Sequence, residues 1–212
     1  FNVIRSIISR LGKRAISLIP EPLILPKIIE ESRSSSESTC LVDIGYGHTT
    51  VTIVENNEIR GFETFPYGSE MLMEMLSMLE SNHSVLQIEN IMCSPVAFHN
   101  DKYRECLEDF LSYIRDAIFG YLQSEHIDVT LENIFLHGNI FENSSITSSF
   151  TQLFHDALGY EPNTKHLHEI YRVKIAHDHC IITGLSLMAN ELLLVKKDPL
   201  VRILRYVLYQ YE

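Results

Sequence analysis

The most informative part of the sequence is Leu41-Val-Asp-Ile-Gly-Tyr-Gly-His-Thr-Thr-Val-Thr-Ile-Val54. Its two halves are rich in β-branched and apolar residues, and the glycine turn Gly45–Gly47 separates them. Such a pattern is typical of two antiparallel strands joined by a tight turn. A third β-rich segment, Glu58–Phe65, follows the turn residues Asn56 and Asn57. We therefore predict a meander of three antiparallel strands.

The segments before and after this meander are predicted to be mainly helical. Upstream, a helix begins near Pro22 and ends in the polar linker 31–39. Downstream, the apolar strand Asn133–His137 comes directly before Gly138. Apolar spacing predicts the remaining elements: helices over 1–12, 68–80, 101–123, 144–158 and 178–195, and a strand over 15–20. Antiparallel strands followed by alternating helices and strands predict an α/β fold with a mixed sheet and flanking helices.

Composition excludes some classes of function. The 212 residues carry 17 Lys and Arg against 28 Asp and Glu, a net charge of −11. Nucleic-acid-binding proteins normally carry a basic excess, so we expect no nucleic-acid partner. The four cysteines form no short-spaced pair, which indicates a reducing, cytoplasmic setting. No stretch approaches the length of apolar sequence that a transmembrane helix needs, so we expect no membrane span.

The glycine turn is a candidate phosphate-binding loop. Glycines such as Gly45 and Gly47 let backbone N–H groups approach phosphate oxygens closely. Thr49 or Thr50 could add a hydroxyl donor, and Asp43 could hold a magnesium ion through water. The same residues also fit a plain hairpin with a glycine turn, because so short a motif is common by chance.

With its surroundings, this stretch resembles the second phosphate motif of the actin-like ATPases. That family includes actin, heat-shock chaperones, sugar kinases and the bacterial cell-division protein FtsA. Glu21-Pro-Leu23 resembles a stretch that FtsA carries just before this motif, and residues 57–68 resemble the next strand and helix-opening glycine of FtsA and its pilus relative PilM. Ile134-Phe-Leu-His-Gly-Asn139 resembles the adenosine motif. Gly184 matches the glycine of the second connecting helix.

The resemblance implies that the chain is the second, ribonuclease H-like half of such a protein. Residues 1–38 would be the end of the preceding half with a connecting helix and linker. Residues 39–197 would be the second domain, with a short insert near 80–101, and 198–212 a C-terminal amphipathic helix. The first phosphate motif would precede Phe1, so this chain alone is not expected to be catalytic. Whether the intact protein turns over ATP stays open.

The resemblance also implies a nucleotide site. The intact protein would bind ATP with magnesium, with Asp43 positioning magnesium-bound water. Gly45, Gly47 and Thr49 would contact the phosphates, and Gly138 would lie under the adenosine.

Three functions follow from the resemblance. The first is an FtsA-like cell-division protein in the cytoplasm that links a cytoskeletal or assembly machine to the inner membrane, with protein partners and self-association. The second is a PilM-like scaffold for pilus or secretion assembly, with lost or weak nucleotide chemistry. The third is a sugar or acid kinase, which fits less well because residues 57–68 resemble FtsA and PilM more than kinases.

The segment 198–212 is the candidate membrane contact. Its apolar residues share one helical face: Leu200, Ile203, Leu204, Val207, Leu208 and Tyr211. Arg202 and Arg205 lie on the other side, as in helices that rest on anionic lipid. The same stripe also fits packing against the protein's own core.

One histidine-rich region is a candidate metal site. It contains His166, His168, His177, Asp178, His179 and Cys180. Two H-x-H pairs could each place both imidazoles on one face of a strand. Mixed polar residues are also normal before a helix, and we favour that structural interpretation over a metal site.

Overall fold

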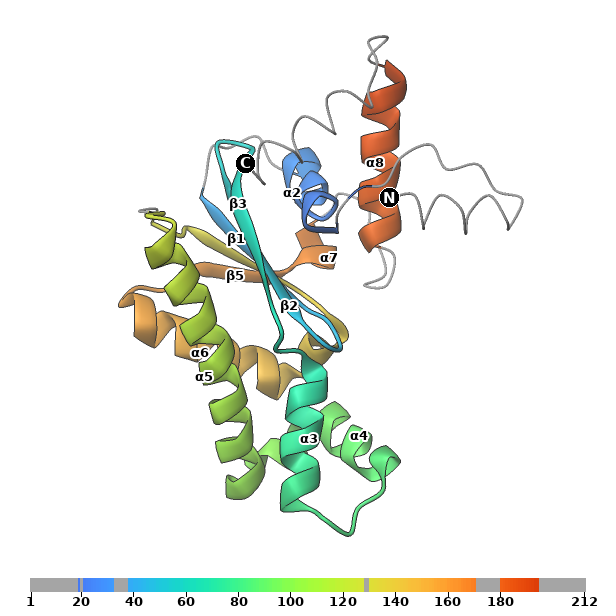
Figure 1. The fold of residues 1–212 in the computed structure, drawn as a ribbon, viewed down its shortest axis with the longest axis vertical. Helices are drawn as coiled ribbons and strands as arrows, with labels where there is room; N and C mark the ends of the chain where they lie inside the picture. Colours follow the sequence, from blue (N-terminus) through green and yellow to red (C-terminus); the bar gives the residue numbers. More distant parts are fainter. Residues whose placement is uncertain (1–18, 20, 33–37, 128–129, 171–179, 195–212) are drawn as a thin grey trace, which may run out of the picture.

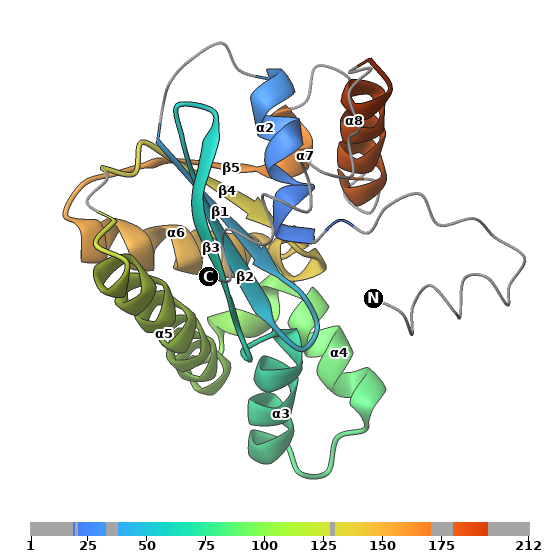
Figure 2. The ribbon, with the colours of Figure 1, turned by 45° about the horizontal axis from the view of Figure 1, so that its top comes forward.

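The computed structural model describes residues 19, 21–32, 38–127, 130–170 and 180–194. At its centre lies a five-stranded sheet in the order β3-β2-β1-β4-β5 (Figure 1). Among the described residues, α2, α7 and α8 lie on one side of this sheet, and α5 and α6 lie on the other (Figures 1 and 2). This arrangement confirms the predicted α/β class with a mixed sheet and flanking helices.

The strands confirm the predicted meander. Their bounds are Thr39–Ile44 (β1), Thr49–Glu55 (β2), Glu58–Phe65 (β3), Asn133–His137 (β4) and Asn163–His166 (β5). β1 pairs antiparallel with β2, and β2 pairs antiparallel with β3. β4 lies parallel to β1 and β5 lies parallel to β4, so the sheet is mixed. Both residues of the β2–β3 turn have positive φ, 53° at Asn56 and 62° at Asn57, as a primed hairpin turn requires. β5 was not predicted.

The helices agree with most of the predicted spans. Their bounds are Pro26–Ser32 (α2), Ser69–Leu79 (α3), Val85–Cys93 (α4), Asp101–Ser124 (α5), Ser144–Leu158 (α6), Leu167–Ile170 (α7) and Cys180–Leu194 (α8). Short 3-10 helices cover Glu21–Leu23 (η1), Pro95–His99 (η2) and Asn139–Glu142 (η3). The helix expected from Pro22 was wrong in its start, because α2 begins only at Pro26, after η1.

The region near 80–101 is helical, which its weak apolar pattern had not indicated. α4 begins at a capping box in which the backbone N–H of Ser84 donates to Oε1 of Gln87 at 2.7 Å. Within α4 only Ile88 is fully buried, and Ile91 and Met92 pack partly buried against the core. α3 and α4 extend together beyond one end of the sheet (Figures 1 and 2).

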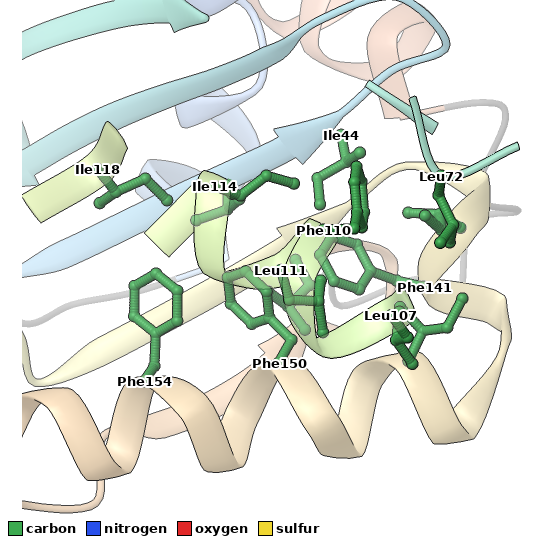
Figure 3. Close-up of a cluster of buried hydrophobic side chains, with 14 of the residues drawn as sticks. Ile44, Leu72, Leu107, Phe110, Leu111, Ile114, Ile118, Phe141, Phe150 and Phe154 are labelled. Carbon is green, nitrogen blue, oxygen red and sulfur yellow. The ribbon is translucent and has the colours of Figure 1, made fainter. Parts of the chain in front are cut away.

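The side chains of alternating sheet residues pack into two separate cores. Cys40, Val42 and Ile44 of β1 face the larger core, whereas Leu41 faces the smaller one. In the larger core, Phe150 and Phe154 of α6 point toward the apolar side chains of α5 (Figure 3). The smaller core packs α2, α7 and the start of α8 against the other face of the sheet. Period-two burial on both faces is expected of a sheet covered by helices on both sides.

Several predicted segments lie outside the described residues: the helix over 1–12, the strand over 15–20 except for residue 19, the C-terminal helix over 198–212, and residues 177–179 of the histidine-rich region. The proposed boundaries 1–38, 39–197 and 198–212 also stay predictions. In the part of the chain that the structure describes, no helix is both long and apolar enough to cross a membrane.

Candidate functional site

A cavity of about 390 Å³ opens where the parallel strands β1 and β4 end. Its lining comes from Asp43, Ile44, Gly45, Tyr46, His48, Ser69, His137, Gly138, Asn139, Ile140 and Ile181. The carboxyl ends of parallel strands are the usual place for a ligand in α/β sheets, because the loops that follow them can form a crevice. Three of the predicted site residues, Asp43, Gly45 and Gly138, therefore line one cavity.

Asp43 and His137 form a hydrogen-bonded pair in the wall of this cavity. The imidazole Nδ1 of His137 lies 2.8 Å from Oδ1 of Asp43. The side chains are only 9% (His137) and 14% (Asp43) exposed, so both are largely buried. Asp43 is the penultimate residue of β1, where strand pairing holds its backbone.

The environment favours a charged His137. Burial lowers the pKa of His137, but the hydrogen bond and charge of Asp43, together with the neighbouring Cys180 side chain, outweigh it and raise the pKa from 6.5 to about 9. The imidazole is therefore protonated at neutral pH, and the two side chains form an ion pair.

Two glycines allow the backbone to pack closely at the cavity. Gly138 has a φ of 114°, and a Cβ at this position would collide with the carbonyl oxygen of Ile44. The Gly45 N–H donates to the carbonyl of His48 at 2.9 Å, which closes the turn. The turn carbonyls of Gly45 and Tyr46 accept from the N–H groups of Ser69 and Glu70 at 3.0 and 2.8 Å. These bonds fix the turn on the start of α3.

The structure does not bring Gly47 and Thr49 into the cavity wall. Thr49 is fully buried, and its hydroxyl donates to the carbonyl of Tyr67 at 2.5 Å. The Thr50 hydroxyl pairs with that of Thr64 at 3.1 Å. Gly47 is exposed, but it lies outside the cavity lining. The phosphate contacts assigned to Gly45, Gly47 and Thr49, and the adenosine contact of Gly138, stay predictions.

Sequence reasoning missed several lining residues, of which His137 is the most informative. It lies within the quoted adenosine motif, at the last position of β4, directly opposite Asp43 in the parallel register. If the predicted strand Asn133–His137 had been placed parallel to β1, the pairing of His137 with Asp43 could have been inferred from the sequence. Ser69 and Ile181 come from helix starts, and no sequence signal pointed to them.

The cavity offers a poor donor set for magnesium. Mg²⁺ prefers an octahedron of oxygens that includes carboxylates and several waters. Asp43 is the one carboxylate among the described lining residues, and the His137 imidazole already occupies one of its oxygens. Among the residues that the structure describes, no group of three or more His, Cys, Asp or Glu could hold a metal ion. The residues present do not fit a magnesium site at Asp43.

The histidine-rich region does not form the predicted strand arrangement. His166 ends β5, whereas His168 lies in α7, so the pair does not share one strand face. Their ring centroids are 5.4 Å apart. Burial lowers the pKa of His166, with smaller opposing effects from neighbouring charges, which favours a neutral ring. The structural interpretation of these two histidines is the better one.

Solved structures share this fold. The structure of the ethanolamine utilization protein EutJ from Carboxydothermus hydrogenoformans matches 88% of the chain with a TM-score of 0.60 and 18% identity. MreB 5 of Spiroplasma citri, bound to AMPPNP, matches 90% with a TM-score of 0.66 and 14% identity. The PilM–PilN type IV pilus biogenesis complex matches 83% with a TM-score of 0.59 and 16% identity. The chain has the actin-like fold.

The chain spans only part of the length of the proteins it matches. It covers 60% of EutJ, 53% of the matched chain of the PilM–PilN complex and 64% of MreB 5. No protein-family model matches the sequence, and no curated protein matches it. Since the identities are low, the likeness shows the fold, which agrees with the resemblance to actin-like ATPases. The FtsA branch and the assignment to the second half stay predictions.

Proposed function

We propose that this chain is the nucleotide-binding half of an actin-like protein that serves as a scaffold in an assembly machine. The observation that carries the proposal is the cavity where β1 and β4 end, lined by both Gly45 and Gly138 in an actin-like fold. Its volume of about 390 Å³ is within the range of roughly 300–1,000 Å³ typical of small-molecule sites. MreB 5, which shares the fold, is bound to the ATP analogue AMPPNP.

The proposed ligand is ATP, with its phosphates toward the Gly45 turn and its adenosine over Gly138. Ile140 and Ile181 supply apolar surface for a base, and Ser69 and Asn139 supply neutral polar groups. The resemblance pairs ATP with magnesium, but the donor set at Asp43 does not favour that ion. The proposal is therefore limited to the nucleotide.

Two exposed positions of η3 provide a matched test. Asn139 lines the cavity, whereas Glu142 lies in the same short helix and outside the lining. We expect Asn139→Trp to fill the cavity and weaken AMPPNP binding about tenfold or more, measured by isothermal titration calorimetry. Glu142→Trp should bind as the unmodified protein does. Equal binding by all three proteins would show that nucleotide does not occupy this cavity.

A scaffold role requires that the protein binds protein partners. The PilM structure that shares this fold is a complex with PilN, which supports a PilM-like role in pilus or secretion assembly. Co-purification from the native organism, followed by cross-linking, identifies the partner. Recovery of pilus or secretion components supports the scaffold, whereas a chain that stays alone contradicts it.

An FtsA-like role in cell division is the second candidate. The residues that favour it are Glu21–Leu23 and 57–68, which resemble FtsA. In this role the protein would be cytoplasmic and would contact the inner face of the membrane through 198–212. Flotation on anionic liposomes tests this, with the full protein compared with a version that ends at Lys197. Equal flotation of both, or of neither, contradicts the membrane role.

A further inference from the structure

The Asp43–His137 pair is built into the centre of the sheet. β1 and β4 run parallel with Asp43 directly opposite His137, one residue before β1 ends and at the last residue of β4. Both side chains are largely buried, and both line the cavity. The backbone pairing of two central strands therefore fixes the distance between carboxylate and imidazole.

This pairing changes what the carboxylate can bind. One oxygen of Asp43 accepts the imidazole hydrogen bond at 2.8 Å. With one oxygen held by the imidazole and the side chain only 14% exposed, little of the carboxylate is left to meet a hydrated divalent cation. No other described residue of the lining carries a carboxylate that could compensate. The cavity offers the polar groups of Ser69 and Asn139 instead.

We infer that Asp43 is the structural partner of His137, and that the cavity binds phosphate groups without a divalent cation at Asp43. The nucleotide part of this inference rests on the proposed function. The part that concerns Asp43 and His137 does not, because it can be tested with the metal ion alone. Removing His137 should then expose a carboxylate that Mg²⁺ can bind.

The first experiment measures thermal unfolding of the purified protein with and without MgCl₂. The unmodified protein should not be stabilised by Mg²⁺ beyond its response to the same ionic strength of NaCl. His137→Ala should melt lower and should regain stability in MgCl₂, because binding to the folded state raises Tm. The regained stability should disappear when Asp43→Asn is added to His137→Ala.

Two results would overturn the inference. One is a Mg²⁺-dependent rise in Tm of the unmodified protein that Asp43→Asn abolishes, because the carboxylate would then already bind the ion. The other is a His137→Ala protein that Mg²⁺ does not stabilise, because His137 would then not be what keeps the ion away. If His137→Ala does not fold, His137→Leu removes the hydrogen-bond donor at a more similar size and is judged by the same criteria.

The second experiment titrates AMPPNP in EDTA and in MgCl₂. We expect Kd values that differ by less than about tenfold between the two buffers. A larger loss of affinity in EDTA that is also lost in Asp43→Asn contradicts binding without a cation. Absence of AMPPNP binding in both buffers would overturn the proposed function and the phosphate part of the inference, while the melting experiment still decides the role of His137.

Discussion

Gly138 lies so close to the carbonyl oxygen of Ile44 that no Cβ fits between them. The backbone after β4 therefore packs directly on the end of β1, where the cavity begins. Gly159, which caps α6 with a φ of 74°, is also left-handed, but a Cβ there would meet nothing within 4 Å. Both positions therefore favour glycine by conformation, and only Gly138 also favours it by close packing.

Gly138→Ala should destabilise the protein more than Gly159→Ala. Gly159→Ala carries only the cost of a left-handed non-glycine residue, about 1 kcal/mol. Gly138→Ala adds a collision with the backbone of Ile44, which cannot move without disturbing the sheet. Urea unfolding of both variants measures the difference. Equal losses would mean that the contact between Gly138 and Ile44 does not constrain the fold.

Stability should fall as the pH rises from about 6.5 to about 9, because His137 has a raised pKa of about 9 in the folded state against 6.5 as the ordinary value. A raised folded pKa stabilises fully below the unfolded value and loses that contribution as pH passes the folded value. Urea unfolding across this pH range checks the slope. His137→Gln should flatten it, and an unchanged slope in that variant would contradict the ion pair.

Thr49→Val should lower stability by about 1 kcal/mol without changing AMPPNP affinity. The buried Thr49 hydroxyl donates to the carbonyl of Tyr67, which a valine leaves without this donor. Thr147→Val is the control, because its hydroxyl makes the same kind of bond to the carbonyl of Phe141, away from the cavity lining. If only Thr49→Val weakened AMPPNP binding, the predicted phosphate contact of Thr49 would be supported.

Phe150→Ala should destabilise the larger core by about 3–5 kcal/mol. The Phe150 ring is fully buried and stacks on Phe154 at a centroid distance of 4.4 Å (Figure 3). Val96→Ala, at a position that is 68% exposed, should change stability by less than about 0.5 kcal/mol. Denaturant unfolding compares the two. A small effect at Phe150 would show that this part of the core is not well packed.

Local sequence signals were sufficient to predict the three-stranded meander and most helices. Gly45–Gly47 and the pair Asn56–Asn57 are turn residues, and the segments between them have the β-branched residues that strands favour. α4 was missed because it is only 9 residues long, and its first apolar residues, Val85 and Leu86, are exposed and do not contribute to the core. β5 was missed because Asn163–His166 is polar and half exposed, and pairing with β4 makes it a strand.

The antiparallel start, the mixed α/β class and the glycine turn after Asp43 can be read from the sequence, because these depend on neighbouring residues. The contacts that the residues of this region make depend on the folded chain. Asp43 and His137 are 94 positions apart and meet because β1 and β4 pair in parallel. The Thr49 hydroxyl is turned inward by its bond to Tyr67. Neither contact is encoded in local spacing, since each depends on how distant segments pack in the folded chain.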